Sequence, residues 1–147
     1  MKSRNFDTFP QPEWNTAGSI ALALESLRNA HDQSSSNKAY DRFLYAVGNN
    51  HAGTYYPIVL ATLPELKQLL IGGGFWSQYA VMESLIDLGV SFVPKVGYEL
   101  HDGITVQRAL HAEIRSMRPH VLLLVGGRDA RSKSASDLIK FIDDQPA

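Results

Sequence analysis

Two internal prolines, each followed by an apolar stretch that ends at glycines, constrain the fold of this chain more than any other feature. Pro64 and Pro119 are 55 residues apart, and the phrases that close the two units, Met82–Asp87 and Leu138–Asp143, are 56 apart. Each unit therefore reads as a proline-kinked helix, a glycine turn and a second helix. Such a helix pair cannot bury its apolar face alone, so we expect the pairs to stack on one another.

Apolar residues at helical spacing extend this pattern toward the N-terminus, where a first, more divergent pair is expected. Its two inner faces consist of Ile20, Ala23, Leu24 and Leu27, and of Tyr40, Phe43, Leu44 and Val47. Residues 1–13 are polar and contain Pro10 and Pro12, which predicts an irregular arm. Residues 90–103 contain Pro94 and two glycines among β-favouring residues, which predicts a long inserted loop with or without a short hairpin.

Composition excludes several classes of function. The 147 residues carry a formal net charge of −1, which argues against direct binding of nucleic acid. The absence of cysteine excludes disulfides, thiolate metal sites and a cysteine nucleophile. No apolar run approaches the roughly 20 residues that a membrane span needs, and no secretory signal is visible at the N-terminus, so we expect a cytoplasmic protein with no membrane partner.

The segment His51–Pro57 reads His-Ala-Gly-Thr-Tyr-Tyr-Pro and runs into the apolar stretch that contains Pro64. It resembles the His-x-Gly-Thr-x-Tyr-Pro phrase that precedes a proline-kinked helix in bacterial HEAT-repeat-like proteins. The resemblance covers residues 40–143, with a longer repeat than the usual 40 to 47 residues. It implies an all-α, HEAT-like α-solenoid of about three helix pairs, in one domain over residues 1–147, that binds proteins and has no catalytic residues. Small domains of this general kind also serve as immunity proteins beside polymorphic or contact-dependent toxins.

A helix that is expected to start near Phe75–Ser77 and to end at Gly89 holds the first group of candidate partner-binding residues. Trp76 and Tyr79 open it, and these residue types are either core aromatics or exposed interface anchors. Glu83 and Asp87 follow at i, i+4 spacing with no basic residue to offset them on that face. A solvated helix face is one explanation, and an acidic strip that meets a basic partner is the other.

The inserted loop holds the second group, which is the densest cluster of acid–base groups in the chain. It consists of Tyr98, Glu99, His101 and Asp102. A plain polar loop, contact with a partner, and general acid–base catalysis all fit this composition. The five histidines lack the i, i+4 spacing of a helical metal site, so neither a metal nor another cofactor is expected.

These patterns favour a non-catalytic protein-binding module, and most specifically an immunity protein that occludes a cognate toxin, such as a basic nuclease domain. The oligomeric state stays open. A rival interpretation makes Val121–Asp129 the strand and phosphate-binding turn of a small α/β enzyme or nucleotide-binding protein, although no glycine-rich fingerprint is present. A third makes the chain an adaptor in a larger assembly.

Overall fold

The computed structural model describes residues 6–145 of the chain. Helices hold 65% of the residues, and the described part contains seven α-helices together with two small β-sheets of three and two strands. The prediction of an all-α solenoid is therefore wrong. The strands lie in connections between helices, where β-branched and aromatic residues can pair across short turns.

The first helix pair consists of α1 (Ser19–Arg28) and α2 (Gln33–Val47). A capping box begins α2: the Asp32 carboxylate accepts a hydrogen bond from the Ser35 backbone N–H at 2.8 Å, and the Ser35 hydroxyl accepts one from the Asp32 N–H at 3.1 Å. The apolar faces expected from the sequence are buried, except that Tyr40 is only half-buried.

The second pair consists of α3 (Ile58–Gly72) and α4 (Phe75–Ile86). Pro64 lies inside α3, where it removes one backbone hydrogen bond of the helix. A glycine turn joins the two helices, and Gly73 approaches α3 so closely that a Cβ atom there would lie 2.5 Å from the Leu69 carbonyl oxygen. Any larger residue would therefore force this turn open.

The third pair differs from the prediction at Pro119. A single helix running through Pro119 to Val125 is expected from the sequence, but α5 (Val106–Ser116) ends first and a short helix, α6 (Arg118–Leu122), follows it. Proline lacks the N–H that a helix interior needs, whereas at Pro119 it occupies the first turn of α6, where no such bond is required.

The last helix is α7 (Ala130–Asp143). The sequence Ser134-Ala-Ser-Asp137 fits a capping box and predicts a helix that starts at Ser134, but α7 begins before that residue. Asp129 caps it instead, because its carboxylate accepts a hydrogen bond from the Ser132 backbone N–H at 2.8 Å. Ser134 thus lies within the helix and is free to bond elsewhere.

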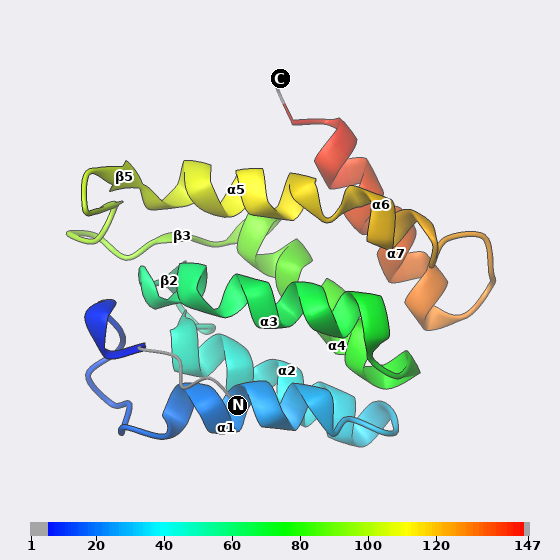
Figure 1. Ribbon diagram of the computed structural model, residues 1–147, viewed down its shortest axis with the longest axis horizontal. Helices are drawn as coiled ribbons and strands as arrows, with labels where there is room; N and C mark the ends of the chain where they lie inside the picture. The colour runs from blue at the N-terminus through cyan, green and yellow to red at the C-terminus, as the bar shows by residue number, and fades with distance from the viewer. Residues whose placement is uncertain (1–5, 146–147) are drawn as a thin grey trace.

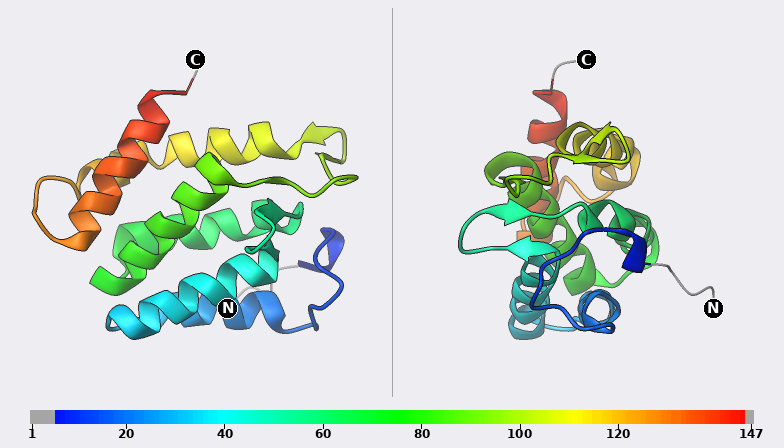
Figure 2. Two further views of the ribbon diagram at one scale, coloured as in Figure 1. Left: turned by 180° about the vertical axis from the view of Figure 1, so that it is seen from behind. Right: turned by 90° about the vertical axis from the view of Figure 1, so that its left-hand side faces the viewer.

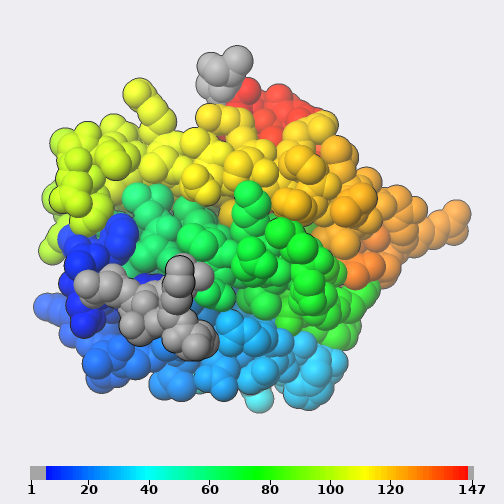
Figure 3. Space-filling view, in the orientation of Figure 1, coloured from blue at the N-terminus to red at the C-terminus, as the bar shows by residue number. Residues whose placement is uncertain are grey.

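The three pairs stack along one axis in two layers (Figures 1 and 2). The helices α1, α3 and α5–α6 form one layer, and α2, α4 and α7 form the other behind it. Figure 3 shows the first layer in space-filling form, with the stacked helices covering this face of the molecule. The middle helix of the second layer, α4, contacts both α2 and α7.

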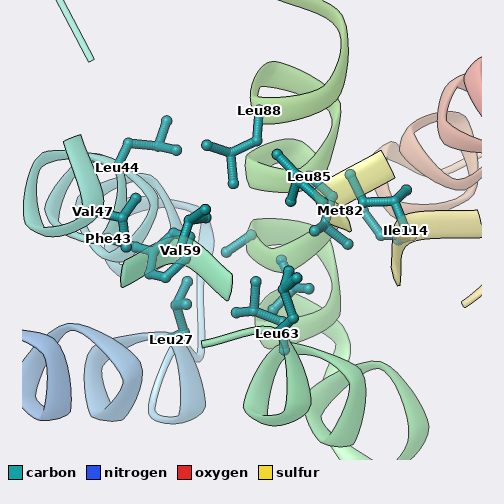
Figure 4. Packing of buried hydrophobic residues seen from close by; sticks show 14 of the residues in the cluster. Leu27, Phe43, Leu44, Val47, Val59, Leu63, Met82, Leu85, Leu88 and Ile114 are labelled. Carbon is teal, nitrogen blue, oxygen red and sulfur yellow. The ribbon is translucent and has the colours of Figure 1, made fainter. Parts of the chain in front are cut away.

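The core runs through all three pairs, between the two layers. Figure 4 shows buried side chains of α1 to α5 and of the turn after α4 meeting in one cluster. The labelled side chains are Leu27, Phe43, Leu44, Val47, Val59, Leu63, Met82, Leu85, Leu88 and Ile114. Because every pair contributes to this cluster, no pair buries its apolar face without its neighbours.

A three-stranded sheet joins the ends of α2 and α4. The strands β1 (Gly48–Asn49) and β2 (Thr54–Tyr55) pair antiparallel, and β3 (Val93–Pro94) adds to β2 in parallel. A Cβ atom at Gly48 would collide with the Thr54 carbonyl, so glycine is required where β1 approaches β2. A π-helical turn, η2 (Asp87–Ser91), carries the chain from α4 to β3. The first part of the predicted loop is therefore the end of this turn, followed by a strand.

The rest of that segment forms a β-hairpin, one of the two forms that the sequence left open. The strands β4 (Leu100–His101) and β5 (Ile104–Thr105) pair antiparallel around Asp102 and Gly103. Both turn residues have positive φ, 51° for Asp102 and 78° for Gly103. An Asp-Gly pair is a favoured sequence for such a two-residue turn, because these residues tolerate the left-handed backbone region.

The part of the N-terminal arm that the structure describes is irregular apart from a short 3-10 helix, η1 (Phe6–Thr8), and residues 1–5 of the predicted arm lie outside it. Phe6 and Phe9 pack against the core cluster, and Pro10 accepts a backbone hydrogen bond from Ile58 at 3.0 Å. Across residues 6–145, no helix combines the length and the apolar character that crossing a membrane requires.

Candidate functional site

The aromatic residues at the start of α4 form a half-buried ladder. The ring of Trp76 meets that of Phe75 edge-on at a centroid distance of 4.9 Å, and it meets the ring of Tyr79 edge-on at 5.5 Å. The Ser36 hydroxyl of α2 donates a hydrogen bond to the Trp76 carbonyl oxygen at 3.0 Å, which ties this end of α4 to α2. Trp76 and Tyr79 are therefore only partly buried, and both pack against neighbouring side chains rather than projecting freely into solvent.

The two carboxylates of α4 are held by neighbouring helices. Glu83 accepts a hydrogen bond from the Ser134 hydroxyl of α7 at 2.7 Å, and Asp87 accepts one from the Tyr40 hydroxyl of α2. Neither carboxylate forms an ion pair in the described part of the chain. The predicted acidic pair therefore retains its charge, although each member also fixes a contact between helices.

These charges act on the neighbouring phenols. Burial raises the pKa of Tyr40, and the hydrogen bond to Asp87 and the charges of Asp87, Glu83 and Asp41 raise it further. Burial and the charge of Glu83 likewise raise the pKa of Tyr79. Both side chains are therefore neutral hydroxyl groups at any physiological pH, and neither is poised to act as a base.

A small pocket lies between α2 and α4 at this point. It has a volume of about 130 Å³ and is lined by Ser36, Asn37, Tyr40, Tyr79, Ala80 and Glu83. No lysine or arginine lines it. The pocket thus combines two phenol rings with a carboxylate.

The four candidates in the 90–103 segment make local structural contacts, and only the turn position of Asp102 carries a sequence signal. The ring of Tyr98 lies against that of Tyr56 at 5.0 Å, and the Glu99 carboxylate accepts a hydrogen bond from the Gly97 N–H at 2.9 Å. His101 stacks on Phe9 of the arm at 4.7 Å, and Asp102 forms the hairpin turn.

The arrangement does not bring the two groups of candidates together. The start of α4, with Trp76 and Tyr79, lies at one end of the long axis of the molecule, and the β4–β5 hairpin lies at the other (Figures 1 and 2). Within residues 6–145, no group of three or more histidine or acidic residues is placed to hold a metal ion.

Sequence reasoning missed the exposed apolar side chains of the segment that leads from η2 into the hairpin. Half of the large hydrophobic side chains exposed in the described part of the chain fall within residues 90–104, namely Val90, Val93, Val96, Tyr98, Leu100 and Ile104. Their β-favouring character was visible, but not the fact that the segment turns them outward. A second pocket, of about 360 Å³, lies beside Tyr98 and includes Trp14, Tyr56 and Lys95 in its lining.

The segment Val121–Asp129 does not form the strand of the rival interpretation. Val121 and Leu122 end α6, and the residues after them form turns and bends, with Gly126 at a φ of 103°. A phosphate-binding βα turn needs a strand before its glycines, and none is present at this point.

Known proteins offer no match to this chain: no family model, no curated protein and no solved structure matches it. The resemblance of residues 40–143 to HEAT-repeat-like proteins stays a prediction from the sequence.

Proposed function

We propose that this protein is a non-catalytic, cytoplasmic binding module, and specifically an immunity protein that blocks a cognate protein toxin. The observation that carries the proposal is the concentration of exposed apolar side chains in one segment, namely Val90, Val93, Val96, Tyr98, Leu100 and Ile104, here called the 90–104 surface. Concentrations of exposed apolar side chains on a water-soluble fold mark sites of contact with other molecules.

The 90–104 surface suits a protein partner because its backbone is attached to the rest of the fold at two points. The segment is fixed to the body of the molecule at β3, whose backbone bonds to β2, and at His101, which stacks on Phe9. The backbone that carries its apolar side chains is therefore held in place before binding, which lowers the conformational entropy that docking costs. Removing them from water would supply the driving force for association.

Charge supports a basic partner. Glu83 and Asp87 add uncompensated negative charge on α4, and complementary charge accelerates encounter more than it adds affinity. Under this proposal the apolar surface provides most of the binding energy, and the partner is neutralised because its working surface is covered. A basic nuclease domain is a toxin class with the required charge.

Capture of partners from the native host tests the proposal. Val96→Asp places a charge in the 90–104 surface, and Leu123→Asp is its matched control because both side chains are 82% exposed. We expect the wild-type chain and Leu123→Asp to retain one protein at equal yield, and Val96→Asp to retain about tenfold less or lower. Equal retention by all three chains would refute the proposed surface, and recovery of no specific protein would refute the function. A partner that is not toxic would favour the adaptor.

A further inference from the structure

The pocket between α2 and α4 combines aromatic side chains and a carboxylate in its lining, with no lysine or arginine. Tyr40, Tyr79 and Glu83 all line a space of about 130 Å³. Aromatic faces attract cations, and the attraction is strongest where water is partly excluded. A carboxylate at the same place selects for positive charge over neutral groups.

Within residues 6–145, no ion pair neutralises the acidic side chains at the pocket. Glu83, Asp87 and Asp41 all lie near enough to Tyr40 for their charges to act on its hydroxyl, and none of them forms an ion pair in residues 6–145. Two cations of α7 lie toward α4, and each has its own partner: Lys133 senses the charge of Glu83 but bonds to Asp137 at 3.0 Å, and Arg131 bonds to Gln78 at 2.9 Å.

The geometry also holds the carboxylate in place. One oxygen of Glu83, Oε2, accepts the Ser134 hydroxyl at 2.7 Å, which leaves Oε1 available to a further donor. Asn37 contributes a side-chain amide to the rim with no hydrogen bond to another described residue. A ligand with several N–H donors in one plane could therefore lie on a phenol ring and bond to both groups.

We propose that this pocket binds an arginine side chain of a basic protein partner. The guanidinium group fits because it is planar, permanently charged, stacks on aromatic rings and carries five N–H donors. The inference deepens the proposed function, since it names the chemistry by which the partner is recognised. It places a second contact on α4, away from the 90–104 surface, so that one partner would span much of the length of the molecule.

The test uses short peptides as probes, so it does not depend on finding the partner. Acetyl-Gly-Arg-Gly-amide is titrated into the isotope-labelled full chain at low salt, and amide shifts are followed by NMR. The control peptide replaces arginine by citrulline, which has nearly the same shape but no charge. We expect saturable shifts confined to α2 and α4, with an affinity about tenfold weaker or lower for the citrulline peptide.

Variants of the chain locate the effect. Glu83→Gln and Tyr79→Leu are each expected to lower the affinity for the arginine peptide by about fivefold or more. Glu113→Gln is the control, because it makes the same change of charge at an exposed carboxylate on α5, and it should leave the affinity unchanged. Thermal unfolding confirms that each variant is folded. Equal binding of both peptides, or equal weakening by Glu113→Gln, would overturn the proposal. If the arginine peptide binds as expected while host capture recovers no protein, the pocket stands and the proposed function fails.

Discussion

Two tyrosine hydroxyls of this protein have opposite surroundings. Tyr55 is fully buried, and its hydroxyl has no hydrogen-bond partner among the described residues, whereas the Tyr40 hydroxyl donates to Asp87. A buried hydroxyl without a partner loses its bonds to water and gains nothing in return, at a cost of about 1–3 kcal/mol. The same chemical deletion should therefore have different effects at the two positions.

We predict that Tyr55→Phe leaves the free energy of unfolding unchanged or raises it by about 1 kcal/mol, because it removes an unsatisfied group. Tyr40→Phe is expected to lower it by about 1–2 kcal/mol, because Asp87 loses a donor. Urea unfolding at neutral pH measures both values. A clear loss of stability in Tyr55→Phe would show that its hydroxyl is bonded after all.

The free energy of unfolding is also expected to depend on pH through the titration of His111. Burial lowers the pKa of His111, whose Nε2 atom is buried, and the charge of Arg115 lowers it further. The unfolded chain then binds this proton more readily than the folded one, so the contribution of His111 is present above the ordinary pKa of 6.5 and is lost as the pH falls below it.

The expected result is a decline in the free energy of unfolding between pH 7 and pH 5 that is smaller in His111→Gln. Urea unfolding across this range is the measurement, and His31→Gln, at an exposed histidine, is the control. If the free energy of unfolding declined equally in His111→Gln and in the wild type, the pH dependence would come from other groups and the prediction would be wrong.

At the scale of elements, the sequence predicted what local periodicity encodes. The buried face of α4, with Val81, Met82 and Leu85, follows from spacing alone. The pairing of β2 with β3 could not be predicted, because it joins two-residue strands that are far apart in the sequence and too short to show alternation. The β4–β5 turn did carry a signal, the Asp102-Gly103 pair.

The start of α7 gives a sharp test of a helix boundary. Asp129 caps this helix, so Asp129→Ala should lower the free energy of unfolding by about 1 kcal/mol, since it leaves the Ser132 N–H without a partner. Asp137→Asn, which breaks only an exposed ion pair with Lys133, should cost about 0.5 kcal/mol or less. Equal effects in urea unfolding would contradict the assignment of the cap.

At the scale of the whole molecule, the candidate site could be predicted only in part. Residue type and spacing identified Tyr79 and Glu83, which line one pocket with residues of α2, and Trp76, whose ring contacts Tyr79. Spacing could not reveal that Tyr98 packs against Tyr56 and that His101 packs against Phe9 of the arm. Nor could it reveal the 90–104 surface, because exposure is a property of the folded chain.

The proposed function requires that the 90–104 surface binds a toxic protein and blocks its activity. The most direct measurement is the growth of cells that express the captured host partner together with this chain. We predict that the partner alone arrests growth, that the wild-type chain and Leu123→Asp restore growth, and that Val96→Asp does not. Full protection by Val96→Asp, or a partner that leaves growth unaffected, would contradict the proposed function.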